Sequence, residues 1–258
     1  MLFKLGQNAG YMIDGVVAHS SQDDFSEKKQ TAWNNTRQSI DQDIPCYGWE
    51  LDIPEYYVVY GYDDKGYYFS GAGCDGGKGP KPWQEMGNSE IGVLEMYTVR
   101  PGSVVDDKTT VKEALEFALE HAKSPDKWIN PRYKAGLGGY DNWINALEAG
   151  TALGHGVAYN AAVWSECRIF AVQFLLEARG RLDDESYNFL FDEAARHYEN
   201  VYINLLKVAK LFPFPPKGDE INSNRKRKKA IKYLQKARKA EESGLNSLAK
   251  IVRELGAR

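Results

Sequence analysis

The stretch DIPEYYVVYGYDDKGYYFSG, residues 52–71, decides the fold of the first part of the chain. Two runs rich in aromatic and β-branched residues, 56–62 and 66–70, flank the turn Asp63-Asp64-Lys65-Gly66. Such runs favour β-strands, and glycine most easily takes the positive φ of a tight turn, so the stretch predicts an antiparallel hairpin. Because side chains alternate along a strand, half of the tyrosines should be buried, and the others should line a surface able to stack on a flat or sugar-like ligand.

The segments around the hairpin predict three further strands and one helix. The strands are expected at residues 10–19, 46–51 and 90–99, and Arg100-Pro101-Gly102 should end the last one. Ser26 is a candidate N-cap for a helix that runs to residue 40. Residues 71–82 contain five glycines and two prolines, so this segment is predicted to be a loop.

After about residue 105 the sequence has the apolar spacing of amphipathic helices. Helices are expected at residues 111–123, 140–147, 157–179, 183–210 and 224–255. The run 157–179 is the most apolar and should lie at the centre of a bundle, where Glu166 or Arg168 would need an ion-pair partner. The chain is therefore predicted to be α+β, with an antiparallel sheet and a helix in residues 1–105 and an all-helical bundle in residues 106–258.

Composition excludes several classes of protein. The 258 residues are 43% apolar and 27% charged, which is typical of globular proteins, and the net charge is −3. The sequence has no run of about 18 apolar residues, so no membrane span is expected, and its start has no signal-peptide pattern. Three scattered cysteines form no CxxC motif, which favours a reduced, cytoplasmic protein.

Four phrases of the sequence are considered together: SIDQDIPCYGWEL (39–51), PEYYVVYGYDDKGYYFSG (54–71), GLGGYDNWINALE (136–148) and AYNAAVWSECRIFAVQFLLEA (158–178). In this order they resemble a bacterial family with a papain-like, peptidase-C39-like domain and a helical tail, related to the N-terminal domain of butirosin-biosynthesis protein H. The resemblance implies a partial papain-like antiparallel sheet in residues 1–105. It also implies a site built from a cysteine nucleophile at a helix start, a histidine base and an orienting Asp or Asn.

The resemblance also implies that the catalytic histidine and aspartate are absent from this sequence. Glu55 falls at the family's histidine position and Gly71 at its aspartate position. Cys46 follows Pro45 at the start of a predicted strand rather than a helix, so a small buried residue is expected there instead of a nucleophile. The nucleophile's helix should precede residue 10, which leads us to expect that it lies in a missing N-terminal segment or in a partner chain.

Two functions follow as hypotheses. The first is a non-catalytic C39-like domain that binds a small molecule or peptide, with ligand-binding candidates Glu55, Tyr57, Asp63, Cys74 and Trp83. In this hypothesis Cys74, in the Gly-rich loop, should be exposed and the most reactive thiol. The second is an acyl or peptidyl transferase, or a cysteine hydrolase, that uses Glu55 as a carboxylate base and takes its nucleophile from elsewhere.

Neither hypothesis needs a cofactor or metal. The scattered residues His155, Glu166, Glu193 and His197 lack the Glu-x-x-His pairs of a helical di-metal site. The basic run 225–229 is expected to be a solvated helix face, with nucleic acid an unlikely partner. Apolar positions of the same helix, from Ile231 to Leu255, have near-heptad spacing, which favours packing in the bundle or in a homo-oligomer.

Overall fold

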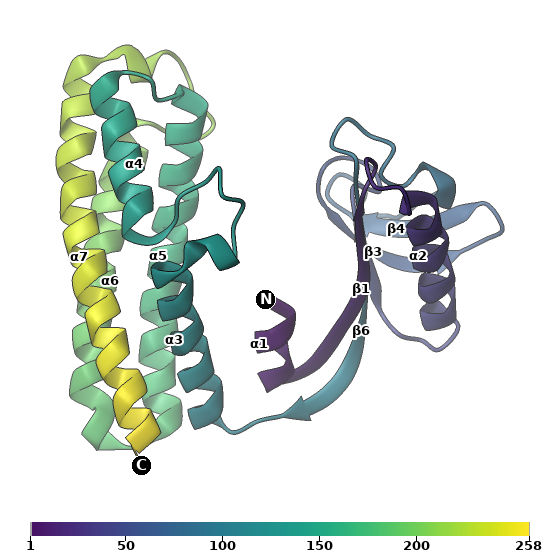
Figure 1. The fold of residues 1–258 in the computed structure, drawn as a ribbon, viewed down its shortest axis with the longest axis horizontal. Helices are drawn as coiled ribbons and strands as arrows, with labels where there is room; N and C mark the ends of the chain where they lie inside the picture. Colours follow the sequence, from purple (N-terminus) through teal and green to yellow (C-terminus); the bar gives the residue numbers. More distant parts are fainter. Residues whose placement is uncertain (1, 258) are drawn as a thin grey trace. The chain divides into compact units, whose positions relative to one another are not determined.

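The computed structural model describes residues 2–257, with the side chains of Leu2 and Lys4 left out. Within these residues the protein is mixed helix and sheet, with one six-stranded antiparallel sheet and seven α-helices, and most of its secondary structure is helical. The chain divides into two compact units between Val105 and Asp106, called here the sheet unit and the helical unit (Figure 1). Among residues 2–257, none of the helices combines the length and the apolar character that a membrane span requires.

The sheet unit contains six strands and two helices. In chain order these are α1 (Leu2–Asn8), β1 (Ala9–His19), α2 (Phe25–Ile40), β2 (Cys46–Trp49), β3 (Tyr56–Tyr62), β4 (Gly66–Gly71), β5 (Lys78–Pro82) and β6 (Val93–Val104). The strand order is β1-β6-β2-β3-β4-β5, and every neighbouring pair is antiparallel. The predicted hairpin is confirmed as β3 and β4.

The core of the sheet unit lies between α2 and one face of the sheet. Trp33 of α2 is 4% exposed and packs edge-on against Tyr67 of β4, with 5.0 Å between ring centroids. Trp33 also stacks on Trp83 at 5.8 Å. Burying several large rings together stabilises a small unit strongly, because each removes 150–250 Å² from water.

Three local predictions were wrong. The predicted loop 71–82 contains strand β5, which pairs with β4, and the pairing is so close at Gly66 that a Cβ there would lie 1.8 Å from the Lys81 oxygen. β6 runs on through Pro101 to Val104, because beyond residue 98 it pairs only with β1 and its other edge can accommodate proline. α2 begins at Phe25, so Ser26 lies inside the helix, and Asp24 before it makes no capping hydrogen bond.

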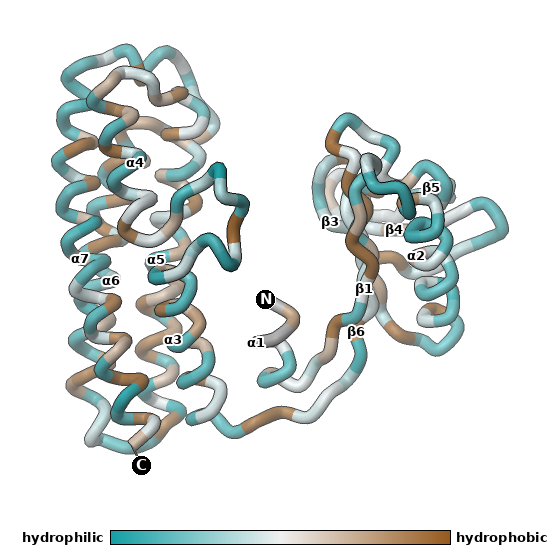
Figure 2. The backbone as a smooth tube through the Cα atoms, in the orientation of Figure 1, coloured by the Kyte–Doolittle hydropathy of each residue, from teal (hydrophilic) through white to brown (hydrophobic). Residues whose placement is uncertain are grey.

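The helical unit is built from five helices. They are α3 (Asp107–Lys123), α4 (Gly136–Ala149), α5 (Gly154–Leu182), α6 (Asn188–Leu211) and α7 (Asn224–Ala257). One core cluster joins α4, α5, α6 and α7, and a second joins α3, α5, α6 and α7. The short helices α4 and α3 therefore pack against different segments of the same three long helices. In Figure 2 apolar segments recur at intervals along α7 between polar ones, as expected for an amphipathic helix.

A buried ion pair links α5 to α7. Arg168 donates two hydrogen bonds to Glu241, from Nε at 2.7 Å and from Nη2 at 3.0 Å, and Tyr140 of α4 donates a third at 3.2 Å. The prediction that Arg168 or Glu166 needs an ion-pair partner is confirmed for Arg168, while Glu166 is exposed.

The prediction that residues 157–179 lie at the bundle centre was wrong. Only one side of α5 is buried, and Trp164 and Phe170 on its other side are 43% and 58% exposed. The prediction relied on the high proportion of apolar residues in this helix. That proportion does not indicate how many of its sides are covered by neighbouring helices.

Candidate ligand-binding face of the sheet

One face of the sheet is covered by α2 (Figure 1). The other face is exposed along β3, and we call it the open face; at β6 it is partly covered, because Phe3 of α1 packs edge-on against Tyr97 with 5.0 Å between ring centroids. Along β3, Tyr57 and Val59 point toward α2 and are each 1% exposed. Tyr56, Val58 and Tyr60 alternate with them and are 49%, 56% and 54% exposed. The alternation predicted for the hairpin is therefore confirmed, and its exposed half lies on the open face.

Four aromatic rings gather on the open face, where β6, β2 and β3 lie side by side. Tyr47 of β2 is directly opposite Tyr97 of β6, with ring centroids 5.0 Å apart. The ring of Tyr56 lies 5.9 Å from that of Tyr47 and 5.0 Å from that of Trp49. We call these four residues the aromatic cluster. Such tilted and edge-to-face contacts fix the rings relative to one another. Tyr56 is 49% exposed and Tyr47 and Trp49 are half-buried, so these three rings are accessible to a ligand, whereas Tyr97 is 6% exposed and supports them from below.

Glu95 of β6 lies beside the aromatic cluster and accepts hydrogen bonds from two of its tyrosines. The Tyr97 hydroxyl donates at 3.1 Å, and the Tyr56 hydroxyl donates to the same carboxylate oxygen. Burial raises the pKa of both phenols, and the Glu95 charge raises each further, so both remain protonated donors at neutral pH.

The Glu95 carboxylate has no ion-pair partner among the side chains that the structure describes. It is half-buried, which strengthens its electrostatic interactions relative to a fully solvated carboxylate. A negative charge in a cluster of aromatic side chains is an arrangement that attracts organic cations, through ion pairing and cation–π attraction.

The cysteines do not provide a nucleophile with a base. Cys46 is 1% exposed on β2, its thiol donates to the Ile44 oxygen at 3.5 Å, and burial raises its pKa to about 11. At neutral pH this thiol is therefore protonated. In the described part of the chain, no histidine is hydrogen-bonded to a cysteine.

The resemblance places Glu55 at the position of the catalytic base and Gly71 at that of the orienting residue, and these two positions have different surroundings. Glu55 is exposed just before β3, and its backbone oxygen accepts a hydrogen bond from Glu50 N at 2.9 Å. Gly71 ends β4, and a Cβ built there would lie 2.8 Å from the Tyr57 ring. An aspartate side chain at position 71 would therefore require the Tyr57 ring to move.

Two of the predicted ligand-binding residues have structural roles in the hairpin. The buried Tyr57 hydroxyl donates to Ala72 O at 3.0 Å and accepts from Ile53 N at 3.2 Å, so its ring belongs to the core. Asp63 accepts from Lys65 N and Gly66 N at 2.8 and 3.0 Å, and these bonds lower its pKa. Asp63 thus closes the turn between β3 and β4.

The other two predicted residues pack against the core of the sheet unit. Trp83 stacks on Trp33 and is half-buried. Cys74 is also half-buried against this core, so the expectation that it would be exposed was wrong; Cys167 of α5 is the exposed cysteine.

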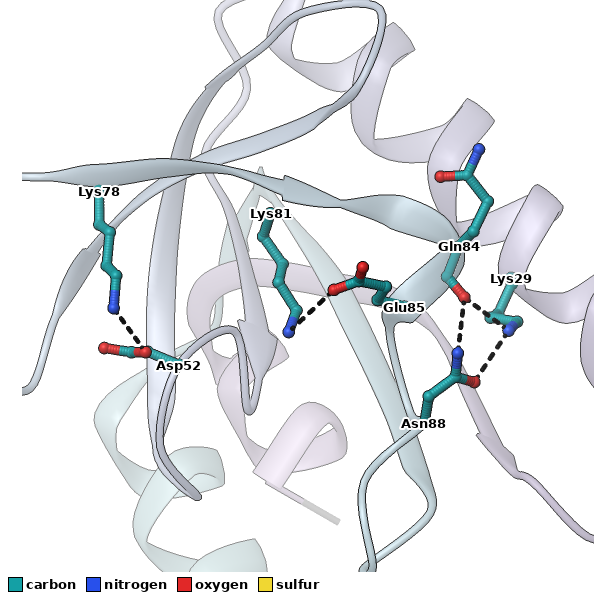
Figure 3. A network of polar contacts seen from close by, with 7 residues as sticks. All are labelled: Lys29, Asp52, Lys78, Lys81, Gln84, Glu85 and Asn88. Atoms are coloured by element: carbon teal, nitrogen blue, oxygen red, sulfur yellow. Dashed lines mark hydrogen bonds and ion pairs between the residues drawn. The ribbon is translucent and has the colours of Figure 1, made fainter.

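The segment around β5 is held by polar contacts on both sides (Figure 3). Lys78 binds Asp52 at 2.7 Å, and Lys29 of α2 donates to Gln84 O at 2.8 Å and to Asn88 Oδ1 at 3.2 Å. These contacts connect the Gly-rich segment to its neighbours, so it is an ordered edge of the sheet. It does not form part of the aromatic cluster.

The four candidate metal ligands, His155, Glu166, Glu193 and His197, do not form a metal site. Within the described residues no group of three or more His, Cys, Asp or Glu side chains is placed to hold a metal ion. His155 stacks on Tyr159, with 6.2 Å between ring centroids, and Glu193 pairs with Lys250 at 3.3 Å.

No family model matches the chain, and no curated protein matches it significantly. The candidate site therefore depends on geometry alone. Sequence reasoning missed Glu95 and Tyr97 of β6 and Tyr47 and Trp49 of β2. The available signal was alternation along YGW and EMY, which places Tyr47, Trp49, Glu95 and Tyr97 on the side opposite the buried Cys46 and Met96.

Proposed function

We propose that the sheet unit is a non-catalytic, papain-like C39-like domain that binds a small molecule or a peptide on its open face. In this proposal the aromatic cluster and Glu95 recognise a positively charged group of the ligand. The observation that carries it is a carboxylate beside four aromatic rings, hydrogen-bonded by two tyrosines, with no ion pair among the described side chains.

The chemistry of these groups selects the class of ligand. A cation over an aromatic ring gains about 0.5–1 kcal/mol at an exposed site and about 2 kcal/mol when water is excluded. A hydrogen bond to a charged group adds about 1.5–3 kcal/mol. A guanidinium or alkylammonium group, free or on a basic peptide side chain, would use both. A neutral ring would gain only the stacking contribution.

Calorimetric titration with matched pairs of ligands tests this proposal. We expect choline to bind more tightly than its uncharged isostere 3,3-dimethyl-1-butanol, and arginine amide more tightly than citrulline amide. Glu95→Gln should weaken binding of the cations about tenfold, since about 1.4 kcal/mol of charge interaction is lost.

Glu90→Gln is the matched control, because it removes one carboxylate from an exposed position outside the site. It should leave both affinities unchanged. Equal binding of the charged and uncharged isosteres would refute the proposed selectivity, as would wild-type affinity in Glu95→Gln.

The catalytic alternative, a transferase or cysteine hydrolase, requires a thiolate beside an imidazole. The raised pKa of Cys46 and the lack of space at Gly71 favour the non-catalytic proposal. Treatment with iodoacetamide at pH 6, followed by peptide mapping, separates the two. Rapid labelling of Cys46 or Cys74 would support catalysis and contradict the proposal.

A further inference from the structure

The N-terminal half of α7 carries a row of exposed basic side chains, which we call the basic stripe. It consists of Arg225, Lys228, Lys229, Lys232, Lys236 and Lys239, all exposed and none in an ion pair within the described residues. The members recur every three or four residues, so they share one side of the helix. At 1.5 Å per residue, the stripe is about 21 Å long.

The opposite side of the same segment is fixed in the helical unit. Ala230, Leu234 and Ala237 are fully buried in the core shared by α4, α5, α6 and α7. The stripe therefore lies on a helix that is packed along its opposite side. Lys207 of α6 lies 5.6 Å over the Tyr233 ring and adds a positive charge beside it.

The stripe also lines two open hollows of about 410 and 380 Å³. The first is lined by Lys229, Lys232, Lys236, Lys239, Tyr233 and Gln235, and the second by Asn224, Arg225, Lys228, Lys229 and Lys232. Most of the residues that line the two hollows are basic and none is acidic, which suits an anionic ligand running along the helix.

Helix stability does not account for this charge distribution. Residues 224–239 contain nine Lys and Arg and no Asp or Glu, while the remaining 242 residues contain 24 basic against 36 acidic side chains. The first turn of α7 has no acidic residue, although a helix N-terminus favours negative charge by about 0.3–1 kcal/mol per group. Positive charge at an exposed helix N-terminus, where negative charge is favoured, is typical of a functional site.

We infer that the basic stripe binds the phosphate backbone of a nucleic-acid duplex without reading its sequence. The sequence alone favoured a solvated face; the unpaired row, the hollows and the unfavourable N-terminal charge together favour a long polyanion. Backbone recognition of this kind depends on Lys and Arg, and it carries no base information.

Two other polyanions fit the stripe less well. A membrane surface is bound stably when apolar side chains insert beside the charges, but no large apolar side chain of α7 among the described residues is exposed. A single strand is held by rows of exposed aromatic rings, whereas the only aromatic residue that lines the two hollows is Tyr233, which is half-buried under Lys207.

Fluorescence anisotropy of the full chain with a labelled 20-base-pair DNA duplex tests the inference. With about five phosphate contacts, log Kd plotted against log salt should have a slope of about 4.5, which is about a 500-fold loss of affinity between 50 and 200 mM salt. The triple variant K229A/K232A/K236A should reduce that slope by about 2.7, at 0.9 per contact.

The triple variant K123A/K127A/K134A is the control, since it removes the same charge from exposed positions near the α3–α4 connection. Its slope should match that of the wild type. No duplex binding by the wild type at 50 mM salt, a salt-independent affinity, or equal losses in both variants would overturn the inference. Binding to phosphatidylserine vesicles without binding to the duplex would also overturn it.

Discussion

Replacing Arg168 or Glu241 alone should destabilise the helical unit strongly, whereas replacing both should not. Arg168 and Glu241 form a two-point ion pair, and the Glu241 side chain is 5% exposed against 19% for Arg168. Removing one partner of a buried ion pair costs about 3–5 kcal/mol, while replacing both partners by apolar residues is often close to neutral.

The two single variants should differ in size. Arg168→Met leaves a nearly inaccessible carboxylate with only the Tyr140 hydroxyl, at 3.2 Å, so we expect a loss of about 4 kcal/mol. Glu241→Met leaves a guanidinium that is partly solvated and lies 5.4 Å from the Trp164 ring, so we expect about 3 kcal/mol.

Urea unfolding followed by circular dichroism at 222 nm measures these free energies, because the helical unit contributes most of the helix signal. The double variant R168M/E241M should lie within about 2 kcal/mol of the wild type, which requires a coupling energy of about 5 kcal/mol. Single-variant losses that simply add would refute the reasoning, as would a loss below about 1 kcal/mol for Arg168→Met. Arg196→Met, an exposed arginine of α6, is the control and should change stability by under 0.5 kcal/mol.

Two further predictions concern the sheet unit. The Cys46 thiol should titrate near pH 11 when folded and near 9.0 when unfolded, so its contribution to stability is complete below pH 9 and is lost as the pH rises to 11. Relative to Cys46→Ala, the wild type should lose about 2 kcal/mol across that window in urea titrations, and parallel pH profiles would contradict this. Gly71→Ala should destabilise the unit by about 1–3 kcal/mol, because its Cβ would lie 2.8 Å from the Tyr57 ring, whereas Gly76→Ala meets nothing within 4 Å and should have little effect. Thermal unfolding of both glycine variants checks this, and equal shifts would show that the Tyr57 contact is not the cause.

The parts of the fold that the sequence predicted correctly are those determined by local periodicity. The hairpin of β3 and β4 has alternating residues and a turn closed by Asp63, and both signals lie within 20 residues. Of the five later helices, α3, α4, α5 and α7 begin and end within four residues of the predicted bounds, and α6 begins five residues after the predicted start. The antiparallel sheet followed by helices could therefore be predicted without tertiary information.

The errors arose where a neighbouring strand, rather than local propensity, determines the structure. Glycine and proline normally interrupt strands, yet β5 contains both, because pairing with β4 compensates for their low propensity at the edge of the sheet. In the same way β6 extends past Pro101, since β1 supplies its partner along the whole length.

The candidate site also depends on strand pairing that local sequence patterns do not predict. Glu95 and Tyr56 are 39 residues apart. The hairpin predicts a surface of exposed tyrosines, but no motif indicates that Glu95 lies beside them. Their contact depends on β2 pairing with both β3 and β6, in a register that places Tyr47 opposite Val58 on one side and Tyr97 on the other. A shift of one residue in either pairing would turn the ring or the carboxylate to the face covered by α2. Alternation can therefore predict which residues share a face, but only the register of three strands can predict that a carboxylate lies among the rings.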